Sequence, residues 1–553
     1  MRHATPQSVS WRRFARAATA AVLGSLAGML CPALTDSSGV AVATDAPLAW
    51  RLSVLGAGGD YSSLALDSGG DDHACWLNRG TRRYATNATG TWVTRTLDTP
   101  GEGFGLTYSS AIALDRADAV HIAYDGTESL RYATNASGTW VFTTVDDPGY
   151  DVGDDVAMAV DSKTKVHISY LDRESGRLRY ATDVSGSWVV YDLGPGGYNT
   201  AIAVDSNDKL HIVHDRFTPA SQVAYTTNAP GGWVTVPVGG TMGYYNSVKV
   251  DAAGAAHISY FDGSVRYVTN ASGSWVTTLV DGAPGVAANS SLVLDSAGKA
   301  HVTYGDYDAG SLKYATNASG AWVLSVLAAG EDVGYSSSLA IDGADMLHVT
   351  YTDRSTSKVN YATTRVVVTC KSVAPQDGSV RESSKGSGRG GARDTASKTL
   401  LVGDDKSDRQ QRTILTFDTS KLPDGAVVVA ARLKLLRKSV SGTNPCTTHG
   451  TLSVDVGSPG FGSSLALKAS DFEAAAGAAG AGIVDPTAHA GFFVSQLGAA
   501  ALDRIDRTGR TQLRLAFASA TNADGNADCL VFHSGNATRP SLRPVLVVAY
   551  RVP

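Results

Sequence analysis

Four residues whose side chains could carry out acid–base chemistry lie between positions 214 and 249, where a repeating sequence pattern is interrupted. His214 and Tyr245 could act as general bases, and Arg216 and Lys249 could neutralise the carboxylate of a uronate sugar. Elimination from a uronate needs a base beside a neutralised acid group. If the protein is an enzyme, we expect these four residues to form its catalytic set.

The same region carries aromatic and charged side chains that suit carbohydrate binding. Aromatic rings stack on pyranose faces, and charged groups hydrogen-bond to hydroxyls or to a uronate carboxylate. The candidate ligand-binding residues are Asp154, Asp155, His214, Arg216, Phe217, Tyr244 and Tyr245. A second acidic group, Asp146, Asp147 and Asp151, could supply oxygen ligands to Ca²⁺, the one cofactor that the sequence suggests. The alternative is ordinary polar variation in solvent-exposed loops.

These residues belong to a repeat that extends from residue 61 to residue 364. Each unit holds four alternating apolar segments separated by Gly, Asp, Asn and Ser turns, which is the pattern of a four-stranded antiparallel sheet. One histidine marks the second strand of each unit, and successive histidines are 44 to 48 residues apart. These histidines are His73, His121, His167, His211, His257, His301 and His348. Seven units predict a seven-bladed β-propeller.

The tryptophans predict how the ring of blades closes. The fourth strand begins with tryptophan in six units, namely at Trp92, Trp140, Trp188, Trp233, Trp275 and Trp322. The seventh unit ends after Tyr361 without one, whereas residues 50–55 resemble a fourth strand that lacks the preceding three. We therefore expect this N-terminal strand to complete blade seven and to cover an open sheet edge.

An aspartate precedes each repeated histidine by six residues, as in Asp161 and His167. The two side chains flank the hairpin between the first and second strands, so a hydrogen bond between them could fix the turn. Because the pair occurs in every blade, a structural role is expected. Function is instead expected where the blades differ, in the loops around one mouth of the central channel.

The turn before the fourth strand, Asn-Ala-Ser-Gly-Thr-Trp at residues 135–140, is similar to the Asp-box turn of sialidase-like propellers, with asparagine in the place of aspartate. The resemblance implies a fold and carries over no catalytic residue. The Asn-Ala-Ser and Asn-Ala-Thr triplets also match the N-glycosylation pattern. Their regular recurrence at a turn favours a structural role.

Beyond residue 365 the repeat stops, and strand-like segments at residues 412–417, 427–436, 512–518 and 545–550 indicate a β-sandwich. Segments at 400–404 (Leu-Leu-Val-Gly-Asp), 412–418 (Arg-Thr-Ile-Leu-Thr-Phe-Asp), 422–426, 507–512 and 534–540 resemble the secreted DNRLRE family of jelly-roll domains. That family is related to carbohydrate-binding modules. The resemblance implies attachment to polysaccharide or cell-surface glycan.

The N-terminus carries Arg12, Arg13 and Arg16, an apolar run to about residue 34, and small residues up to Ala43. This order predicts a secretory signal peptide. The expected organisation is a signal peptide (1–43), an all-β propeller (44–365) and a sandwich (366–553), with a secreted or cell-surface location. We expect no membrane-spanning segment after the signal.

Signal removal leaves four cysteines, Cys75, Cys370, Cys446 and Cys529, in an oxidising compartment. We favour a disulfide between Cys446 and Cys529 because both lie in the C-terminal region. Cys75 and Cys370 form either a second bridge or two buried thiols.

Charge and motifs exclude several function classes. A net charge of −5 offers no basic field for nucleic acid, and no phosphate loop or dinucleotide motif is present. The first hypothesis is a monomeric glycan-binding protein in which the propeller is the interaction platform. The alternatives are a polysaccharide lyase or glycoside hydrolase with a binding module, and a non-catalytic scaffold for protein partners.

Overall fold

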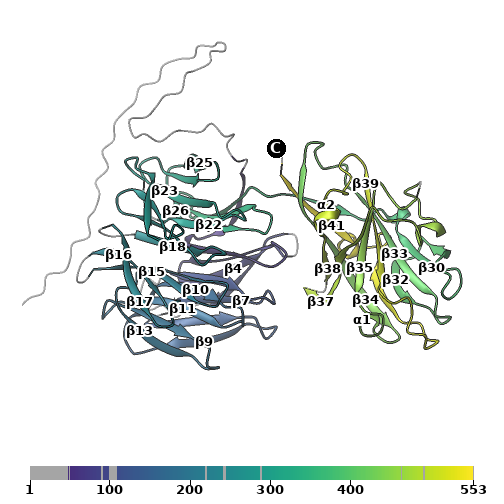
Figure 1. The fold of residues 1–553 in the computed structure, drawn as a ribbon, viewed down its shortest axis with the longest axis horizontal. Helices are drawn as coiled ribbons and strands as arrows, with labels where there is room; N and C mark the ends of the chain where they lie inside the picture. Colours follow the sequence, from purple (N-terminus) through teal and green to yellow (C-terminus); the bar gives the residue numbers. More distant parts are fainter. Residues whose placement is uncertain are drawn as a thin grey trace, which may run out of the picture. The chain divides into compact units, whose positions relative to one another are not determined.

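The computed structural model describes residues 48, 50–88, 91–98, 109–126, 128–217, 221–240, 244–286, 289–462, 464–489 and 492–551. Seven four-stranded antiparallel sheets precede one curled 13-stranded sheet (Figure 1). The predicted all-β fold with a seven-bladed propeller is therefore confirmed. The predicted signal peptide, residues 1–43, lies outside the described residues. Within the described part of the chain, no helix has the length and apolar character needed to cross a membrane.

The first six blades each take four strands that follow one another along the chain. Blades one to three consist of β2 (Asp60–Leu66), β3 (Asp72–Asn78), β4 (Thr81–Thr86) and β5 (Val93–Asp98); β6 (Ser110–Leu114), β7 (Val120–Gly126), β8 (Ser129–Thr134) and β9 (Val141–Asp146); and β10 (Val152–Val160), β11 (Val166–Asp172), β12 (Arg177–Thr182) and β13 (Val189–Pro195). Blades four to six consist of β14 (Tyr198–Val204), β15 (Leu210–Arg216), β16 (Gln222–Thr227) and β17 (Val234–Gly239); β18 (Tyr244–Val250), β19 (Ala256–Phe261), β20 (Val265–Thr269) and β21 (Val276–Asp281); and β22 (Ser291–Leu294), β23 (Ala300–Asp306), β24 (Ser311–Thr316) and β25 (Val323–Ala329).

Blade seven combines the two ends of the propeller. Its sheet contains β26 (Val333–Ile341), β27 (Leu347–Asp353), β28 (Lys358–Thr363) and the N-terminal strand β1 (Arg51–Ala57). β1 pairs antiparallel with the whole of β28, and the Trp50 ring packs edge-on against Tyr314 at 5.6 Å between ring centroids. The predicted closure by the N-terminal strand is confirmed.

An ion pair distinguishes the junction between the last and first blades. His348 Nδ1 lies 2.7 Å from Asp72 Oδ1 on β3, and His348 Nε2 lies 3.6 Å from Asp342 Oδ2. Burial alone would lower the pKa of His348, but the two carboxylates raise it to about 9. His348 is therefore charged at neutral pH and links the two blades at the closure.

The repeated aspartate and histidine contact each other in every blade, as predicted. The seven Nε2–Oδ2 distances are 3.2 to 3.6 Å. The other ring nitrogen, Nδ1, shares a hydrogen bond with the hydroxyl of a third-strand tyrosine: Tyr84, Tyr132, Tyr180, Tyr225, Tyr267, Tyr314 or Tyr361. Each tyrosine ring packs edge-on against a tryptophan of the neighbouring blade at 5.0 to 5.6 Å between centroids. One continuous layer of side chains thus joins blade to blade.

The asparagine of the Asp-box-like turn has a fixed role in this layer. Asn135 Oδ1 accepts a hydrogen bond from Val120 N at 2.7 Å, and Asn270 and Asn317 accept the same bond in their blades. The turn is thereby tied to the start of the second strand. This contact supports the structural interpretation of the repeated triplets.

Replacing Asp161 by alanine should test the structural role of the Asp–His pairs. Asp161 Oδ2 faces His167 Nε2 at 3.4 Å, and Asp161 Oδ1 accepts from Lys163 N and Lys165 N. We expect a loss of roughly 1–3 kcal/mol in unfolding free energy, because buried donors lose their acceptor. Denaturant unfolding measures this loss, and ligand affinity of the folded variant should be unchanged. Lost affinity with unchanged stability would contradict the structural role.

The C-terminal sheet consists of thirteen strands with short helices between them. The strands are β29 (Val366–Lys371), β30 (Gly378–Glu382), β31 (Gly390–Asp394), β32 (Thr399–Asp404), β33 (Gln410–Asp418), β34 (Val427–Ser441), β35 (Leu452–Gly457), β36 (Ala478–Ile483), β37 (Asp485–His489), β38 (Phe492–Gln496), β39 (Arg510–Phe517), β40 (Cys529–His533) and β41 (Val545–Arg551). The helices are α1 (Pro445–Thr448), α2 (Ala499–Leu502) and the 3₁₀ turns η1 (Ala374–Gln376), η2 (Ala469–Asp471) and η3 (Pro540–Leu542).

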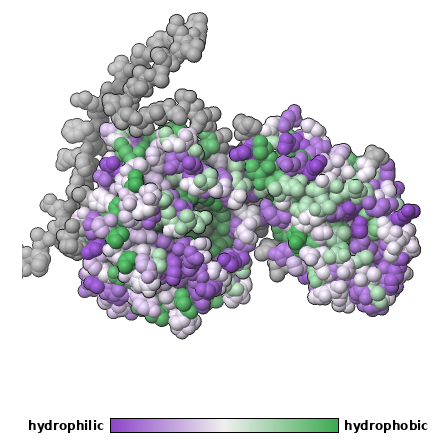
Figure 2. All heavy atoms as spheres, in the orientation of Figure 1, coloured by the Kyte–Doolittle hydropathy of each residue, from purple (hydrophilic) through white to green (hydrophobic). Residues whose placement is uncertain are grey.

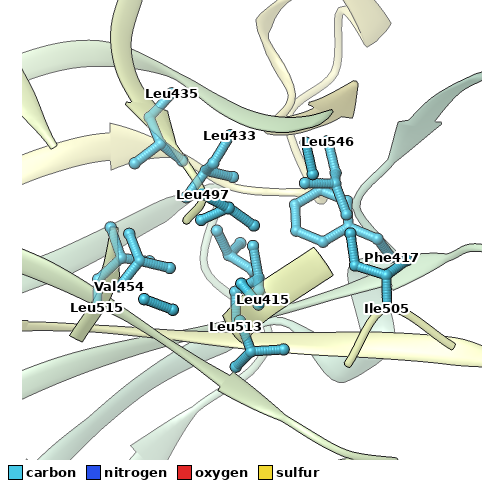
Figure 3. Close-up of a cluster of buried hydrophobic side chains, with 14 of the residues drawn as sticks. Leu415, Phe417, Leu433, Leu435, Val454, Leu497, Ile505, Leu513, Leu515 and Leu546 are labelled. Carbon is cyan, nitrogen blue, oxygen red and sulfur yellow. The ribbon is translucent and has the colours of Figure 1, made fainter. Parts of the chain in front are cut away.

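The long strand β34 makes this sheet curl around one core. Its first part pairs with β41 and β38, and its last part pairs with β40, which belongs to the other layer. Side chains from both layers converge between them, including Leu415, Phe417, Leu433 and Leu515 (Figure 3). The two-layered arrangement agrees with the predicted sandwich.

The predicted disulfide between Cys446 and Cys529 is not formed in this structure. All four described cysteines are free thiols in this structure. Cys529 Sγ is buried and contacts the Asp404 carbonyl oxygen at 3.0 Å, whereas Cys446 is half-buried on helix α1. The Cys529 thiol is thus engaged with its neighbouring strand rather than with Cys446.

The surface of the propeller carries its exposed apolar side chains on the outermost strands. Leu52 and Val54 on β1 and Val326 on β25 are among them. On the face drawn in Figure 2, hydrophobic residues form small separate groups among hydrophilic ones. Such scattered groups are normal for a protein surface.

Candidate functional site

The first strands of all seven blades surround one cavity of about 480 Å³, here called the axial cavity. It is lined by β2, β6, β10, β14, β18, β22 and β26. Pockets for small molecules generally enclose about 300–1,000 Å³. Serine, threonine and asparagine side chains dominate the middle of the cavity wall, so a ligand here would meet hydroxyl and amide groups.

One mouth of the axial cavity is built from strained backbone. In five blades, a non-glycine residue near the start of the first strand adopts a left-handed conformation with φ between 49° and 75°: Tyr61, Asp155, Asn199, Tyr245 and Asn289. In four of these blades the pairing with the second strand shifts register at that point. Such bulges redirect side chains, and left-handed residues cost about 1–3 kcal/mol each. Five blades thus repeat the same strained position at this mouth.

A network of amides and carboxylates connects blades three, four and five at this mouth. Asp155 Oδ2 accepts from Asn199 N at 2.9 Å, and Asn199 Nδ2 donates to Asp215 Oδ2 at 2.8 Å. Asn246 Nδ2 donates to Asp215 Oδ1 at 3.1 Å. Burial raises the pKa of Asp155 to about 6. The network holds its acceptors and donors in fixed positions.

Beside this network, a buried carboxyl group lies next to an ion-paired one. Asp154 Oδ2 forms an ion pair with Arg173 Nη1 at 2.5 Å. Asp125, which is 1% exposed on β7, lies behind it, and burial together with the negative charge of Asp154 raises the pKa of Asp125 to about 9. At neutral pH Asp125 is therefore held as a neutral acid beside Asp154.

An aromatic group borders the mouth on the side of blades six and seven. The rings of Tyr307 and Tyr335 stack with centroids 5.4 Å apart and an interplanar angle of 12°. Arg354 lies over the Tyr335 ring, and Asn289 Nδ2 donates to the Tyr307 hydroxyl at 3.0 Å. Tyr307 is 42% exposed, so part of its side chain remains accessible to solvent.

The sequence did not single out this aromatic group, although a signal was present. Tyr307 and Arg354 occupy the loops that join the second and third strands, each six residues after the repeated histidine. Arg173 occupies the same position in blade three, where it lines the axial cavity. Aligning this single position across the blades would have shown which loops carry large side chains at the mouth.

The structure brings four of the predicted site residues together. Asp154, Asp155, Tyr245 and Lys249 all line the axial cavity. Phe217 is nearby, because its ring packs edge-on against Tyr198 of the cavity wall with centroids 4.6 Å apart.

Two other predicted residues flank the mouth without lining the cavity. Arg216 is half-buried at the end of β15. Tyr244 is the first residue of β18, and its side chain lies outside the described part of the structure.

His214 has a different place from the one expected of a catalytic base. It is 1% exposed and does not line the axial cavity. Its Nδ1 accepts from Gly197 N at 3.2 Å, so Nε2 carries the proton and donates to Thr226 Oγ1 at 3.0 Å. Burial lowers the pKa of His214 to about 4. Both ring nitrogens therefore serve the packing of blade four.

The candidate calcium ligands are not gathered around one point. Asp146 Oδ2 accepts from the Tyr170 hydroxyl at 2.5 Å, whereas Asp147 and Asp151 are exposed. Among the residues that the structure describes, no three His, Cys, Asp or Glu side chains are arranged to hold a metal ion.

Comparison with known proteins gives only distant likenesses. No protein-family model and no curated protein matches the sequence. A solved PL25 polysaccharide lyase, an ulvan lyase bound to -[GlcA(1-4)Rha3S]-, matches at 12% identity and a TM-score of 0.40 over 56% of this chain and 95% of its own. A protein of unknown function from Dyadobacter fermentans matches at 12% identity and a TM-score of 0.36 over 57% of this chain and 98% of its own. Similarity at this level says nothing about what this chain binds.

Proposed function

We propose that the protein is an extracellular glycan-binding protein that binds saccharide at the strained mouth of the axial cavity. The stacked pair of Tyr307 and Tyr335 carries the proposal. An exposed tyrosine ring held flat by a second ring offers a pre-formed surface for the apolar face of a pyranose. Arg354, fixed over Tyr335, adds a directional donor for a sugar hydroxyl or acid group.

The opposite side of the mouth complements this surface. Asp154, Asp155, Asn199 and Asn246 present oxygen and amide groups that are already oriented by hydrogen bonds with one another or with Arg173. Carbohydrate sites combine a few such polar groups with an apolar surface. Because the groups are held in place before binding, little entropy is lost when a sugar enters.

A glycoside hydrolase is the second candidate, and the unequal pair of Asp125 and Asp154 favours it. Acid–base catalysis on a glycosidic bond uses two carboxyl groups of unequal pKa that flank the bond about 5–9.5 Å apart. Asp125, however, is buried behind Asp154 and does not line the cavity. A lyase has less support, because both nitrogens of His214 are engaged. Binding without turnover is therefore the better-supported function.

We also propose secretion and a role for the C-terminal domain in attachment to glycan. The N-terminal signal pattern supports secretion, and the DNRLRE-like segments support a jelly-roll domain related to carbohydrate-binding modules. Those segments include parts of strands β32, β33 and β39. A truncated protein of residues 366–553 that is retained on a glycan surface would support this role.

A polysaccharide array incubated with residues 44–553 tests the propeller. We expect retention on at least one glycan without release of reducing or unsaturated ends. Release of reducing ends would make the protein a hydrolase, and release of unsaturated ends would make it a lyase. Absence of retention on every glycan would leave the protein-scaffold alternative.

Replacing Tyr307 by alanine should lower affinity for the retained glycan roughly ten-fold, since it removes one aromatic stacking surface. Tyr307→Phe should keep most of the affinity. Tyr191→Ala is a matched control, because Tyr191 is 47% exposed on the outer strand β13. Isothermal titration calorimetry measures the three affinities, and thermal melting checks the fold. Equal affinity of Tyr307→Ala and wild type would place the site elsewhere.

A further inference from the structure

Lys249 is the charged residue of the axial cavity for which the saccharide site gives no role. It lies on β18, five residues from the start of that strand, and lines the cavity. The corresponding residue of the other first strands is small or apolar: Ala65, Ala113, Ala159, Ala203, Val293 and Ala340. A lysine thus replaces an alanine-sized side chain in one blade of the ring.

The amine of Lys249 has no counter-charge. Among the described residues it has neither a hydrogen-bond nor an ion-pair partner, whereas Arg173, the other cation lining the cavity, pairs with Asp154. Water can reach the Lys249 side chain, but surrounding protein atoms desolvate the amine and lower its pKa.

Four serines on the same side of the first strands supply hydroxyl donors around the cavity. Their oxygens accept a backbone N–H from the next blade, at 2.9 to 3.3 Å. The serines are Ser247 of blade five, Ser291 of blade six, Ser338 of blade seven and Ser63 of blade one. All four line the axial cavity, and blades two to four have alanine at this position.

These hydrogen bonds leave the four serine hydroxyls free to act as donors. Because each oxygen already accepts from the backbone, its hydrogen is left to donate, and none has an acceptor among the described residues. Ser247 and Lys249 are two residues apart and therefore point to the same side of β18. The half of the cavity formed by blades five, six, seven and one thus offers hydroxyl donors and one ammonium.

We propose that Lys249 and these four serines bind an oxyanion, a carboxylate or a sulfate, inside the axial cavity. Five donors with a single positive charge suit an anion rather than a cation or a neutral sugar. The carboxylates of Asp154 and Asp155 lie four to five residues from the level of Lys249 along their strand, roughly 15 Å at 3.3 Å per residue, so they do not contact an anion held by Lys249. The oxyanion is either free or the acid group of a saccharide, and only the second case rests on the proposed glycan function.

Sulfate, glucuronate and glucose are the probes that test this site on residues 44–553 at low ionic strength. We expect calorimetry to show saturable binding of sulfate or glucuronate. The affinity should fall at least tenfold in Lys249→Met, which keeps the length of the side chain without its charge. Lys358→Met is the control, because Lys358 is exposed on β28. Tighter binding of glucuronate than of sulfate identifies the acid group of a saccharide, and the reverse identifies a free oxyanion.

Thermal melting gives a second, independent readout. Added sulfate should raise the wild-type melting temperature more than that of the variant, and the comparison cancels the general stabilisation by sulfate. Equal anion binding and equal sulfate response in both proteins would overturn the proposal. The Tyr307→Ala result remains separate, so failure of the oxyanion site leaves the glycan site to be judged alone.

Discussion

Deletion of residues 44–57 is expected to abolish the folded monomer or to lower its melting temperature by roughly 10 °C or more. The deletion removes β1, so the backbone groups of β28 that pair with it from Lys358 to Thr363 lose their partners. It also removes Trp50 from Tyr314 and the buried Leu55, which is 7% exposed, from the core between blades seven and one. Calorimetry and size-exclusion chromatography measure the two outcomes.

Two sets of point variants on β1 separate the contribution of its exposed side chains from that of its buried side chain. Leu52→Ser and Val54→Ser alter side chains on β1 that are 55% and 56% exposed, so we expect changes within about 0.5 kcal/mol. Leu55→Ala should cost about 2–4 kcal/mol because it opens a cavity in the core. A deletion variant that stays monomeric with an unchanged melt would refute closure by the N-terminal strand.

Replacing Asp125 by asparagine should stabilise the propeller by an amount that grows with pH. The pKa of Asp125 is raised to about 9 by burial and by Asp154, so folding takes up a proton above the unfolded pKa near 4. This contribution is fully present below pH 4 and is lost as pH rises towards 9. Asparagine has no proton to lose, and its amide can donate to Asp154. The two proteins should be equally stable near pH 4 and differ by a few kcal/mol near pH 8.

Asp172→Asn is the matched control, for which the pH dependence of stability has the opposite sign. Burial alone would raise the pKa of Asp172. Backbone and side-chain hydrogen bonds from Ser175 and the guanidinium of Arg179, which lies 2.8 Å away, lower this pKa instead. Its contribution is present above the unfolded pKa and is lost as pH falls, so Asp172→Asn should destabilise at neutral pH and have little effect in strong acid. Denaturant unfolding from about pH 2 to about pH 9 measures both, with the Asp172 effect disappearing below about pH 4. Parallel curves for wild type and Asp125→Asn would show that Asp125 folds as a charged group.

The sequence predicted the propeller because its signals are local and repeated. Alternating apolar residues report which face of a strand is buried, and a histidine that recurs with its aspartate reports the hairpin. The closure was predictable from a single surplus strand around Trp50. The pairing of Cys446 with Cys529 was not, because proximity in sequence says nothing about the directions in which two thiols point.

The candidate site was predicted only as a region. The expectation that His214 acts as a base followed from its departure from the repeated tyrosine, but the loop opposite encloses the ring. A side chain at Gly196 would clash with the His214 ring, and Gly197 N donates to that ring. The His214 side chain is thus fixed by local packing. The left-handed residues and the stacked Tyr307 and Tyr335 depend on bulges and loop contacts, which alternation patterns do not encode.

In the first strand of each blade, the residues at the mouth of the cavity and the aspartate of the repeated Asp–His pair lie at opposite ends. In blade three, Asp155 stands at the mouth and Asp161 at the layer that joins the blades, about 20 Å apart at 3.3 Å per residue. Changes at such distances usually add independently. Substitutions at the mouth and at the joining layer should therefore change stability independently of each other. For engineering, the mouth residues to vary are those other than the five left-handed positions, because changes at those five would also alter backbone strain and the Asp155–Asn199 bond between blades.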